Sequence, residues 1–338
     1  MRYDDQDRSS SNIEDRRSQR RGFRFPGGFG RGRGRRVRLP MGRKGGFSLT
    51  TLLILGAIML FFGINPLELL TGNMGGGGPR SSIEIPQLPR SDTSSRSPSG
   101  SGLDIPGLPG STQKPAASNS PEEEMKLFIG RVLADTEEVW HRVFKSFGKT
   151  YDEPKLVLFR DYTPTGCGTG QATMGPFYCP LDRKIYIDMS FFDELKRKFS
   201  APGDFAQAYV IAHEVGHHVQ TILGISSKVQ SAKRRSSKKE SNRLQVRMEL
   251  QADCLAGVWA ARNDQLNNRL EPGDIEEGLN AASQIGDDMI QRRQQGYVVP
   301  DAFTHGTAAQ RQRWFLAGFK QGKVQACQPA FELPYERL

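Results

Sequence analysis

The pentapeptide His213-Glu214-Val215-Gly216-His217 constrains the fold of this 338-residue chain more than any other segment. Residues four apart lie on the same face of an α-helix, so both imidazoles can reach one ion if the segment is helical. Apolar residues recur at spacings of three and four between 205 and 223, with Asp204 as a candidate N-cap and Gly224 as a stop. Neutral imidazole suits Zn²⁺, and Glu214 lies close enough to the first ligand to take a proton from a water that the metal activates.

Gly216 and His218 carry separate expectations on this helix. A glycine inside a helix costs about 1 kcal/mol relative to alanine, so we expect another backbone to approach Gly216 closely. His218 points about 100° away from His217 and is expected to pack or to face solvent rather than to bind the ion. The alternative to a metal site is a buried helix in which the histidines only satisfy hydrogen bonds.

A third ligand is expected, because a catalytic zinc takes three protein ligands and keeps one position open. The chain holds only five histidines, which favours a carboxylate. Glu249 and Asp253 lie four apart on a second predicted helix, capped by Ser241, and their apolar neighbours leave both carboxylates in need of a partner. We predict that Glu249 binds the metal and that Asp253 accepts the free ring N–H of His213 or His217. A solvated acidic pair on an exposed helix face is the alternative.

These motifs resemble those of zinc metallopeptidases whose third ligand is glutamate, with His-Glu-x-x-His on one helix and Glu-x-x-x-Asp on the next. More narrowly, residues 122–331 resemble the "putative neutral zinc metallopeptidase" family of bacterial membrane-anchored proteins. The matching stretches also include 178–182, 184–188, 298–307, 310–311 and 314–315. The resemblance implies a zincin-like domain that binds zinc through His213, His217 and Glu249, with Glu214 as the catalytic residue.

His305 lies in a predicted loop just before a helix that starts near Thr307. There it could donate a hydrogen bond to the oxyanion of a tetrahedral intermediate, as a downstream histidine does in other glutamate-type zinc peptidases that this chain resembles. A capping histidine is the main alternative, and a role as a fourth ligand is less favoured. Arg311, one turn into the helix, could anchor this segment to a carboxylate near the site.

Residues 47–64 are 18 consecutive uncharged residues, which as a helix would span about 27 Å, just enough for a bilayer core. The preceding residues 1–46 hold 14 Lys or Arg against 5 acidic residues, a net charge of +9. The positive-inside rule then predicts a signal anchor with a disordered cytoplasmic tail at 1–46 and everything after residue 70 outside the cytoplasm. A cleaved signal peptide is the alternative, disfavoured by the long basic region.

Two more segments are expected to lack a fold of their own. Residues 22–36 interleave Arg and Gly with Phe, a composition typical of segments that bind nucleic acid or anionic lipid. Neither role is needed to explain the charge, so a nucleic-acid partner is not expected. Residues 65–121 are rich in Gly, Ser and Pro and predict a flexible linker between the membrane and the domain that follows.

All four cysteines follow the apolar segment, which favours disulfides in an oxidising compartment. Three connectivities exist, and we favour Cys167–Cys179 together with Cys254–Cys327, since the others would clamp the Glu249 helix to the 167–179 loop. A structural zinc site built from the four cysteines is disfavoured because no Cys-x-x-Cys spacing occurs.

Residues 122–338 are expected to form one α+β domain, a small sheet beside the metal-ligand helices. The patterns predict helices at 122–147 and 275–293 and strands at 155–159 and 184–188. We interpret Ile185-Tyr186-Ile187 as an edge strand that holds the substrate backbone, and the basic run 228–239 as a mobile surface loop.

The function expected from the sequence is that of a zinc-dependent endopeptidase, held by one helix in a bacterial inner membrane and acting on protein or peptide substrates outside the cytoplasm. Two rivals share the same ligands: a proteolytically inactive zinc-binding scaffold and a zinc hydrolase of non-peptide amides. The sequence does not indicate an oligomeric state.

Overall fold

The computed structural model describes residues 1–18 and 120–338. The apolar segment 47–64, the Arg/Gly stretch 22–36 and nearly all of the linker 65–121 lie outside these ranges. Within the described ranges, no helix combines the length and the apolar character that crossing a membrane requires.

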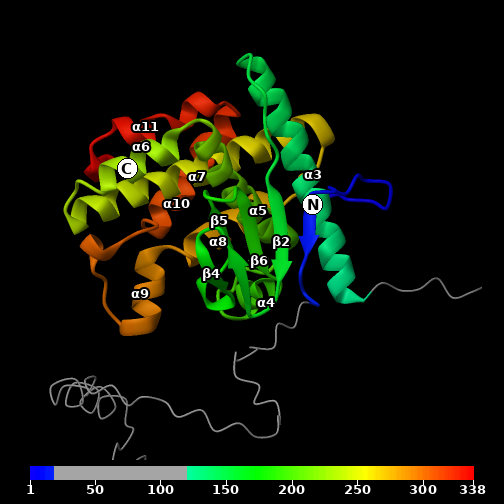
Figure 1. Cartoon of the computed structure of the whole chain (residues 1–338), viewed down its shortest axis with the longest axis horizontal. Helices are drawn as coiled ribbons and strands as arrows, with labels where there is room; N and C mark the ends of the chain where they lie inside the picture. The colour runs from blue at the N-terminus through cyan, green and yellow to red at the C-terminus, as the bar shows by residue number, and fades with distance from the viewer. Residues whose placement is uncertain (19–119) are drawn as a thin grey trace, which may run out of the picture. The chain divides into compact units, whose positions relative to one another are not determined.

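A four-stranded sheet runs through the domain in the order β1-β2-β6-β5 (Figure 1). Its strands are β1 (Ile13–Asp15), β2 (Lys155–Phe159), β6 (Lys184–Asp188) and β5 (Phe177–Cys179). β1, β2 and β6 are parallel, whereas β5 is antiparallel to β6. The two strands predicted at 155–159 and 184–188 are therefore confirmed.

The prediction that residues 185–187 form an edge strand is wrong. β6 lies between β2 and β5, and its residues 185–188 are all buried. Four consecutive buried residues are typical of a central strand, which is covered on both faces. The edge of the sheet on this side is β5, which the sequence analysis did not identify as a strand.

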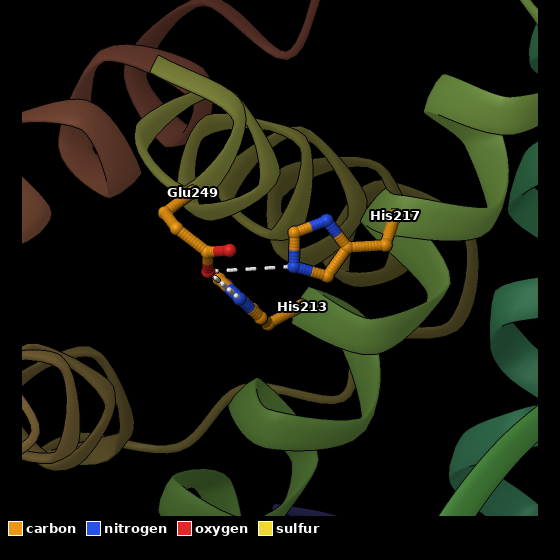
Figure 2. A group of neighbouring side chains, drawn as sticks. All are labelled: His213, His217 and Glu249. Carbon is orange, nitrogen blue, oxygen red and sulfur yellow. Dashed lines mark hydrogen bonds and ion pairs between the residues drawn. The ribbon is translucent and has the colours of Figure 1, made fainter. Parts of the chain in front are cut away.

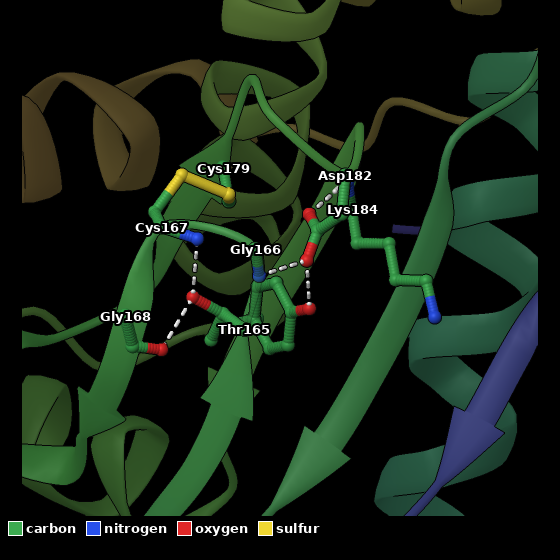
Figure 3. The surroundings of a disulfide bond; sticks show 8 residues. Thr165, Gly166, Cys167, Gly168, Cys179, Asp182 and Lys184 are labelled. Carbon is green, nitrogen blue, oxygen red and sulfur yellow. Dashed lines mark hydrogen bonds between the residues drawn. A yellow bond between two sulfur atoms is a disulfide. The ribbon is translucent and has the colours of Figure 1, made fainter.

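A two-stranded hairpin, β3 (Tyr162–Thr165) and β4 (Gly168–Gln171), is tied to β5 by the disulfide Cys167–Cys179 (Figure 3). At the turn, the amide of Gly166 donates to Asp182 Oδ2 over 2.6 Å, and Thr165 Oγ1 donates to the Gly168 carbonyl over 2.8 Å. The second disulfide, Cys254–Cys327, ties the C-terminal region to the helix of Glu249. Both bonds follow the pairing that the sequence favours.

Helices make up most of the domain. They are α3 (Pro121–Ser146), α4 (Ser190–Arg197), α5 (Asp204–Ile222), α6 (Ile225–Lys233), α7 (Lys238–Asn267), α8 (Asp274–Gln284), α9 (Asp287–Gln295), α10 (Ala308–Gln321) and α11 (Pro329–Glu332). Four short 3-10 turns accompany them: η1 (Ala172–Met174), η2 (Pro300–Ala302), η3 (Val324–Cys327) and η4 (Tyr335–Arg337). The expected α+β class is confirmed, with helices predominating.

Close backbone contacts hold the central helices together. An added Cβ at Gly216 on α5 would lie 3.0 Å from the Ala252 carbonyl oxygen on α7, which is the approach expected there. The crossing of α7 and α10 is tighter, since a Cβ at Gly257 would lie 2.0 Å from the Phe315 oxygen and one at Gly318 would lie 1.9 Å from the Cys254 oxygen. These glycines allow α5, α7 and α10 to pack at backbone distance around the site.

Four details of the helices differ from the sequence expectations. The helix predicted at 275–293 is two helices that break at residues 285–286, where a Cβ on Gly286 would meet the Ala308 amide nitrogen at 2.5 Å. The run 228–239 is not a mobile loop, because α6 continues to Lys233 and α7 starts at Lys238. Ser237, not Ser241, caps α7, and Asp204 is the first residue of α5 rather than its cap.

The N-terminal residues 1–18 are ordered against the domain, so the expectation of disorder is wrong for this part of 1–46. They include β1 and pack beside β2 and α3 (Figure 1). The partners of this polar segment lie more than 100 residues further along the chain, and local composition carries no information about them.

Candidate metal centre

His213 and His217 of α5 face one carboxylate of α7 (Figure 2). Nε2 of His213 lies 3.2 Å from Glu249 Oε2, and Nε2 of His217 lies 3.4 Å from the same oxygen. The candidate ligand atoms of the three residues all lie within 4.8 Å of one another. Two imidazole nitrogens and one carboxylate oxygen are a donor set that zinc accepts, so the residues fit the ion that the sequence predicts.

Asp253 orients His213 from the side opposite the ligand atom. Its Oδ1 lies 2.8 Å from His213 Nδ1, which leaves Nε2 directed at Glu249. The buried Arg311 donates to Asp253 Oδ2 over 2.8 Å, and Tyr209 donates its hydroxyl to Oδ1 over 2.5 Å. Burial opposes ionisation of Asp253, but Arg311 and His213 outweigh it and hold the pKa of Asp253 at about 2. A charged carboxylate therefore fixes the ring of His213.

The other two candidate ligands also have supporting partners. Gln220 Oε1 lies 2.9 Å from His217 Nδ1, and its amide donates to the Met248 carbonyl over 2.8 Å. Gln245 donates to Glu249 Oε1 over 2.6 Å and accepts from Lys233 Nζ over 2.6 Å. Sequence reasoning missed Tyr209, Gln220 and Gln245, although each lies three or four residues from a ligand on the same helix, the spacing that brings side chains together.

The electrostatics of the cluster favour positive charge. Burial disfavours the charged ring of His213, but Asp253 and Glu249 outweigh it and raise its pKa to about 10. The pKa of His217 is raised in the same way, with burial opposing and Glu249 prevailing. A divalent cation between these groups would satisfy the same preference.

Glu214 lies on the wall of a cavity of about 750 Å³ that also includes the three candidate ligands and His305. No hydrogen bond or ion pair to a described residue holds its carboxylate, so the group is available to a molecule in the cavity. Burial raises the pKa of Glu214, while the two neighbouring imidazoles oppose the rise. A carboxylate with a raised pKa, free of partners and beside the ligands, has the properties of a general base.

His305 lines the same cavity from the loop before α10. Its Nδ1 lies 3.1 Å from Asp287 Oδ1, while the amides of residues 304, 305 and 306 donate to Asp287 Oδ2 over 2.6, 2.6 and 3.0 Å. Thr307 and Gln310 form a capping box that starts the helix. One carboxylate therefore holds both the loop and the ring, a role for Asp287 that the sequence did not reveal.

His218 lies apart from the cluster, as the sequence predicts. It is buried between Tyr178, whose hydroxyl is 3.1 Å from Nδ1, and the Asp152 carbonyl, 2.6 Å from Nε2. Burial lowers the pKa of His218 to about 4, so the ring is neutral at physiological pH. It packs α5 against the strand side of the domain.

Comparisons with known proteins agree with this geometry. The family model described as "Putative neutral zinc metallopeptidase" matches residues 105–330. An uncharacterized protein of Escherichia coli K12, YpfJ, is 45% identical over 322 residues, which cover 95% of this chain and 96% of that protein. An uncharacterized protein of Mycobacterium tuberculosis H37Rv, Rv2575, is 41% identical over 207 residues, covering 58% and 69% of the two chains.

No solved structure matches the chain. The family match covers about two-thirds of the sequence, including all three candidate ligands and the acid between them. The chain therefore belongs to the "putative neutral zinc metallopeptidase" family, with His213, His217 and Glu249 as its candidate zinc ligands.

Proposed function

We propose that this protein is a zinc-dependent endopeptidase that hydrolyses peptide bonds in extended protein segments. The observation that carries the proposal is the convergence of His213, His217 and Glu249 on a cavity that Glu214 also lines, with no partner for its carboxylate among the described residues. When bound there, zinc would polarise the scissile carbonyl and lower the pKa of a water molecule. The chain's own residues would supply the remaining steps.

Glu214 would accept a proton from the attacking water and return it to the leaving amine. Its burial raises its pKa above the ordinary value for glutamate, which brings the group closer to the pH at which it must both take and release a proton. His305, held by Asp287, would donate a hydrogen bond to the oxyanion of the tetrahedral intermediate.

The cavity suits an extended peptide. β5 forms one edge of the sheet, and Phe177 and Tyr178 of this strand line the cavity. An edge strand can bind a substrate backbone by β-strand addition, so β5 takes the role that the sequence analysis assigned to residues 185–187. Apolar side chains from α4 and α9, Phe191 and Ile290, also line the cavity and would contact substrate side chains.

We also propose that the domain works outside the cytoplasm and that the apolar segment 47–64 holds it at the membrane. Two disulfides support an oxidising compartment, since such bonds are rare where thiols are kept reduced. The substrates would then be unfolded or extended segments of proteins near the membrane surface.

The test compares the full-length protein with its Glu214→Gln variant on casein, an unstructured protein. We expect cleavage by the wild type and a rate lower by about 10²–10⁴-fold in the variant, with an unchanged zinc content. The control Glu336→Gln alters a side chain that is 71% exposed and should cleave at the wild-type rate. Equal cleavage by Glu214→Gln would contradict the assigned base, and zinc binding without any cleavage would favour an inactive scaffold.

A further inference from the structure

The first 18 residues complete the sheet from the far end of the sequence. β1 lies parallel to β2, with Ile13, Glu14 and Asp15 opposite Leu156, Val157 and Leu158. The Leu156 amide donates to the Asn12 carbonyl over 2.9 Å, and the Arg16 amide donates to the Leu158 carbonyl over 2.8 Å. Without this segment, β2 would be an open edge on the side away from β6.

A buried carboxylate of α3 depends on the same segment. Glu137 is only 1% exposed, and its hydrogen-bond partners among the described residues all come from positions 8, 10 and 12. Arg8 Nη2 donates over 2.8 Å, Asn12 Nδ2 over 2.9 Å, and the Ser10 hydroxyl also donates. A buried charge that loses its partners is strongly destabilising, so the stability of the domain depends on this contact.

Further contacts extend along the segment. Arg269 bridges Asp7 and Asp135, at 2.6 and 3.0 Å, and its guanidinium lies 4.5 Å from the ring centroid of Tyr3. Gly130 on α3 makes room for the segment, because a Cβ there would lie 2.1 Å from Ser9 Oγ. The segment therefore fits this surface through close packing as well as through opposite charges.

The Met1 ammonium lies among carboxylates at the start of the helix that carries His213. It is 2.8 Å from Asp204 Oδ2, 3.2 Å from Glu271 Oε2 and 3.3 Å from Asp274 Oδ2. In the described part of the chain, Asp204, Asp274 and Glu277 are a second group, beside that of His213, His217 and Glu249, whose ligand atoms are close enough to hold a cation. The ammonium already provides positive charge there, so this group is accounted for.

The composition changes where the contacts end. Residues 1–18 hold four Arg and five acidic residues, a net charge of −1. Residues 19–46 hold the other ten of the 14 basic residues and no acid, a net charge of +10. The basic excess therefore lies in residues 19–46 and not in the docked segment.

We infer that residues 1–18 are an integral part of the metallopeptidase domain and lie on the same side of the membrane as its metal site. The single crossing expected from the sequence would place the two on opposite sides, so the inference differs from that expectation. The partner of this surface is the chain's own N-terminal segment, since the strand pairing, the Glu137 contacts and the Arg269 bridge all use its residues.

A carbodiimide tests the docking. It activates a carboxylate, and an amine in contact with that carboxylate then displaces a urea and forms an amide bond. In the full-length protein, Glu14 Oε2 is 2.7 Å from Lys184 Nζ, and Asp15 Oδ2 is 2.9 Å from Lys126 Nζ. We expect both links in a peptide digest. Lys184→Arg keeps the charge but not the reactive amine, so it should remove the first link only.

Two outcomes of this experiment would overturn the inference. The absence of both links from the folded wild-type protein would mean that the segment is not docked. In an equal mixture of ¹⁴N- and ¹⁵N-labelled protein, links that join a light peptide to a heavy one would assign the segment to a second copy. Links within single chains support the inference.

The compartment is tested by labelling a single introduced thiol in spheroplasts of a bacterium that makes the full-length protein. All four native cysteines are in disulfides, so Asp5→Cys and Leu181→Cys each provide one free thiol, at positions that are 107% and 77% exposed. We expect an impermeant maleimide to label both to the same extent before lysis. The inference would be overturned if only one of the two positions were labelled in intact spheroplasts while both reacted fully after detergent was added. Neither the crosslinking nor the labelling measures activity, so both tests are independent of the proposed function.

Discussion

Arg311 on α10 and Asp253 on α7 form an ion pair in which both side chains are 2% exposed or less, with Nε and Oδ2 2.8 Å apart. The second oxygen of the same carboxylate lies 2.8 Å from Nδ1 of His213. One buried carboxylate therefore connects a cation from the C-terminal part of the chain to the orientation of a candidate zinc ligand. The pair links the packing of α10 to the geometry of the metal centre.

Replacing Arg311 by Met should destabilise the protein by about 3–5 kcal/mol, because Asp253 would keep a buried charge without its cation. Urea denaturation of the full-length protein measures this change. In the double variant Arg311→Met with Asp253→Asn, part of the stability should return because the buried charge is gone. Arg313→Met alters an exposed side chain and should change the free energy of unfolding by less than about 0.5 kcal/mol. Equal effects at 311 and 313 would contradict the role of the pair.

Asp253→Asn should weaken zinc binding by about 10–100-fold while leaving all three ligands in place. The amide can no longer stabilise the His213 N–H with a negative charge. Competition with a chelator of known affinity measures the change. Glu249→Gln, which removes a ligand oxygen charge, should weaken binding further, and Asp301→Asn, at a side chain 62% exposed, should leave it unchanged. An unaltered affinity in Asp253→Asn would show that orientation of the ring does not matter.

The alkaline side of the pH–rate profile should depend on Asp287. Desolvation opposes the charged ring of His305, but Asp287 and Glu249 outweigh it and raise the pKa of His305. The Nδ1 proton faces Asp287, so Nε2 carries a proton for the oxyanion only while the ring is charged. Activity should therefore fall as the pH rises through this pKa. Asp287→Asn removes a cause of the raised pKa and should move the alkaline limb to lower pH, with little change in zinc content. A limb that stays in place would exclude His305 as the titrating group.

Gly257→Ala should destabilise the fold by about 1–3 kcal/mol, because the new Cβ would collide with the Phe315 carbonyl oxygen at 2.0 Å and force α7 and α10 apart. Gly216→Ala is the matched comparison, since its nearest contact would be at 3.0 Å and a small shift can relieve it. Thermal and urea unfolding should rank Gly257→Ala as clearly less stable than Gly216→Ala. The reverse order would mean that the α5–α7 crossing is the less tolerant of the two.

Several features of the site follow from local patterns in the sequence. The helix of His213 and His217, the helix of Glu249 and Asp253, and the strands at 155–159 and 184–188 all depend on side-chain spacing within a few turns or residues. A spacing of four on a helix determines which side chains share a face, whatever the rest of the chain does. For this reason the sequence brought the three candidate ligands and Asp253 into one hypothesis.

Other features depended on contacts between segments far apart in the chain. Asp287 supports His305 because the chain breaks between α8 and α9 at Gly286, which packs closely against Ala308. β5 covers the edge of β6 through strand pairing that its own three residues do not predict.

By itself, the sequence determined the helices of the candidate ligands, the carboxylate of Glu214 beside them and the α+β class, since these follow from short-range periodicity. Only the tertiary structure decided which strand is the edge, which carboxylate holds His305, and that residues 1–18 belong to the domain. The physical reason is that Glu137 and its partners at 8, 10 and 12 are polar residues of ordinary composition. Their pairing becomes favourable only when folding buries them together.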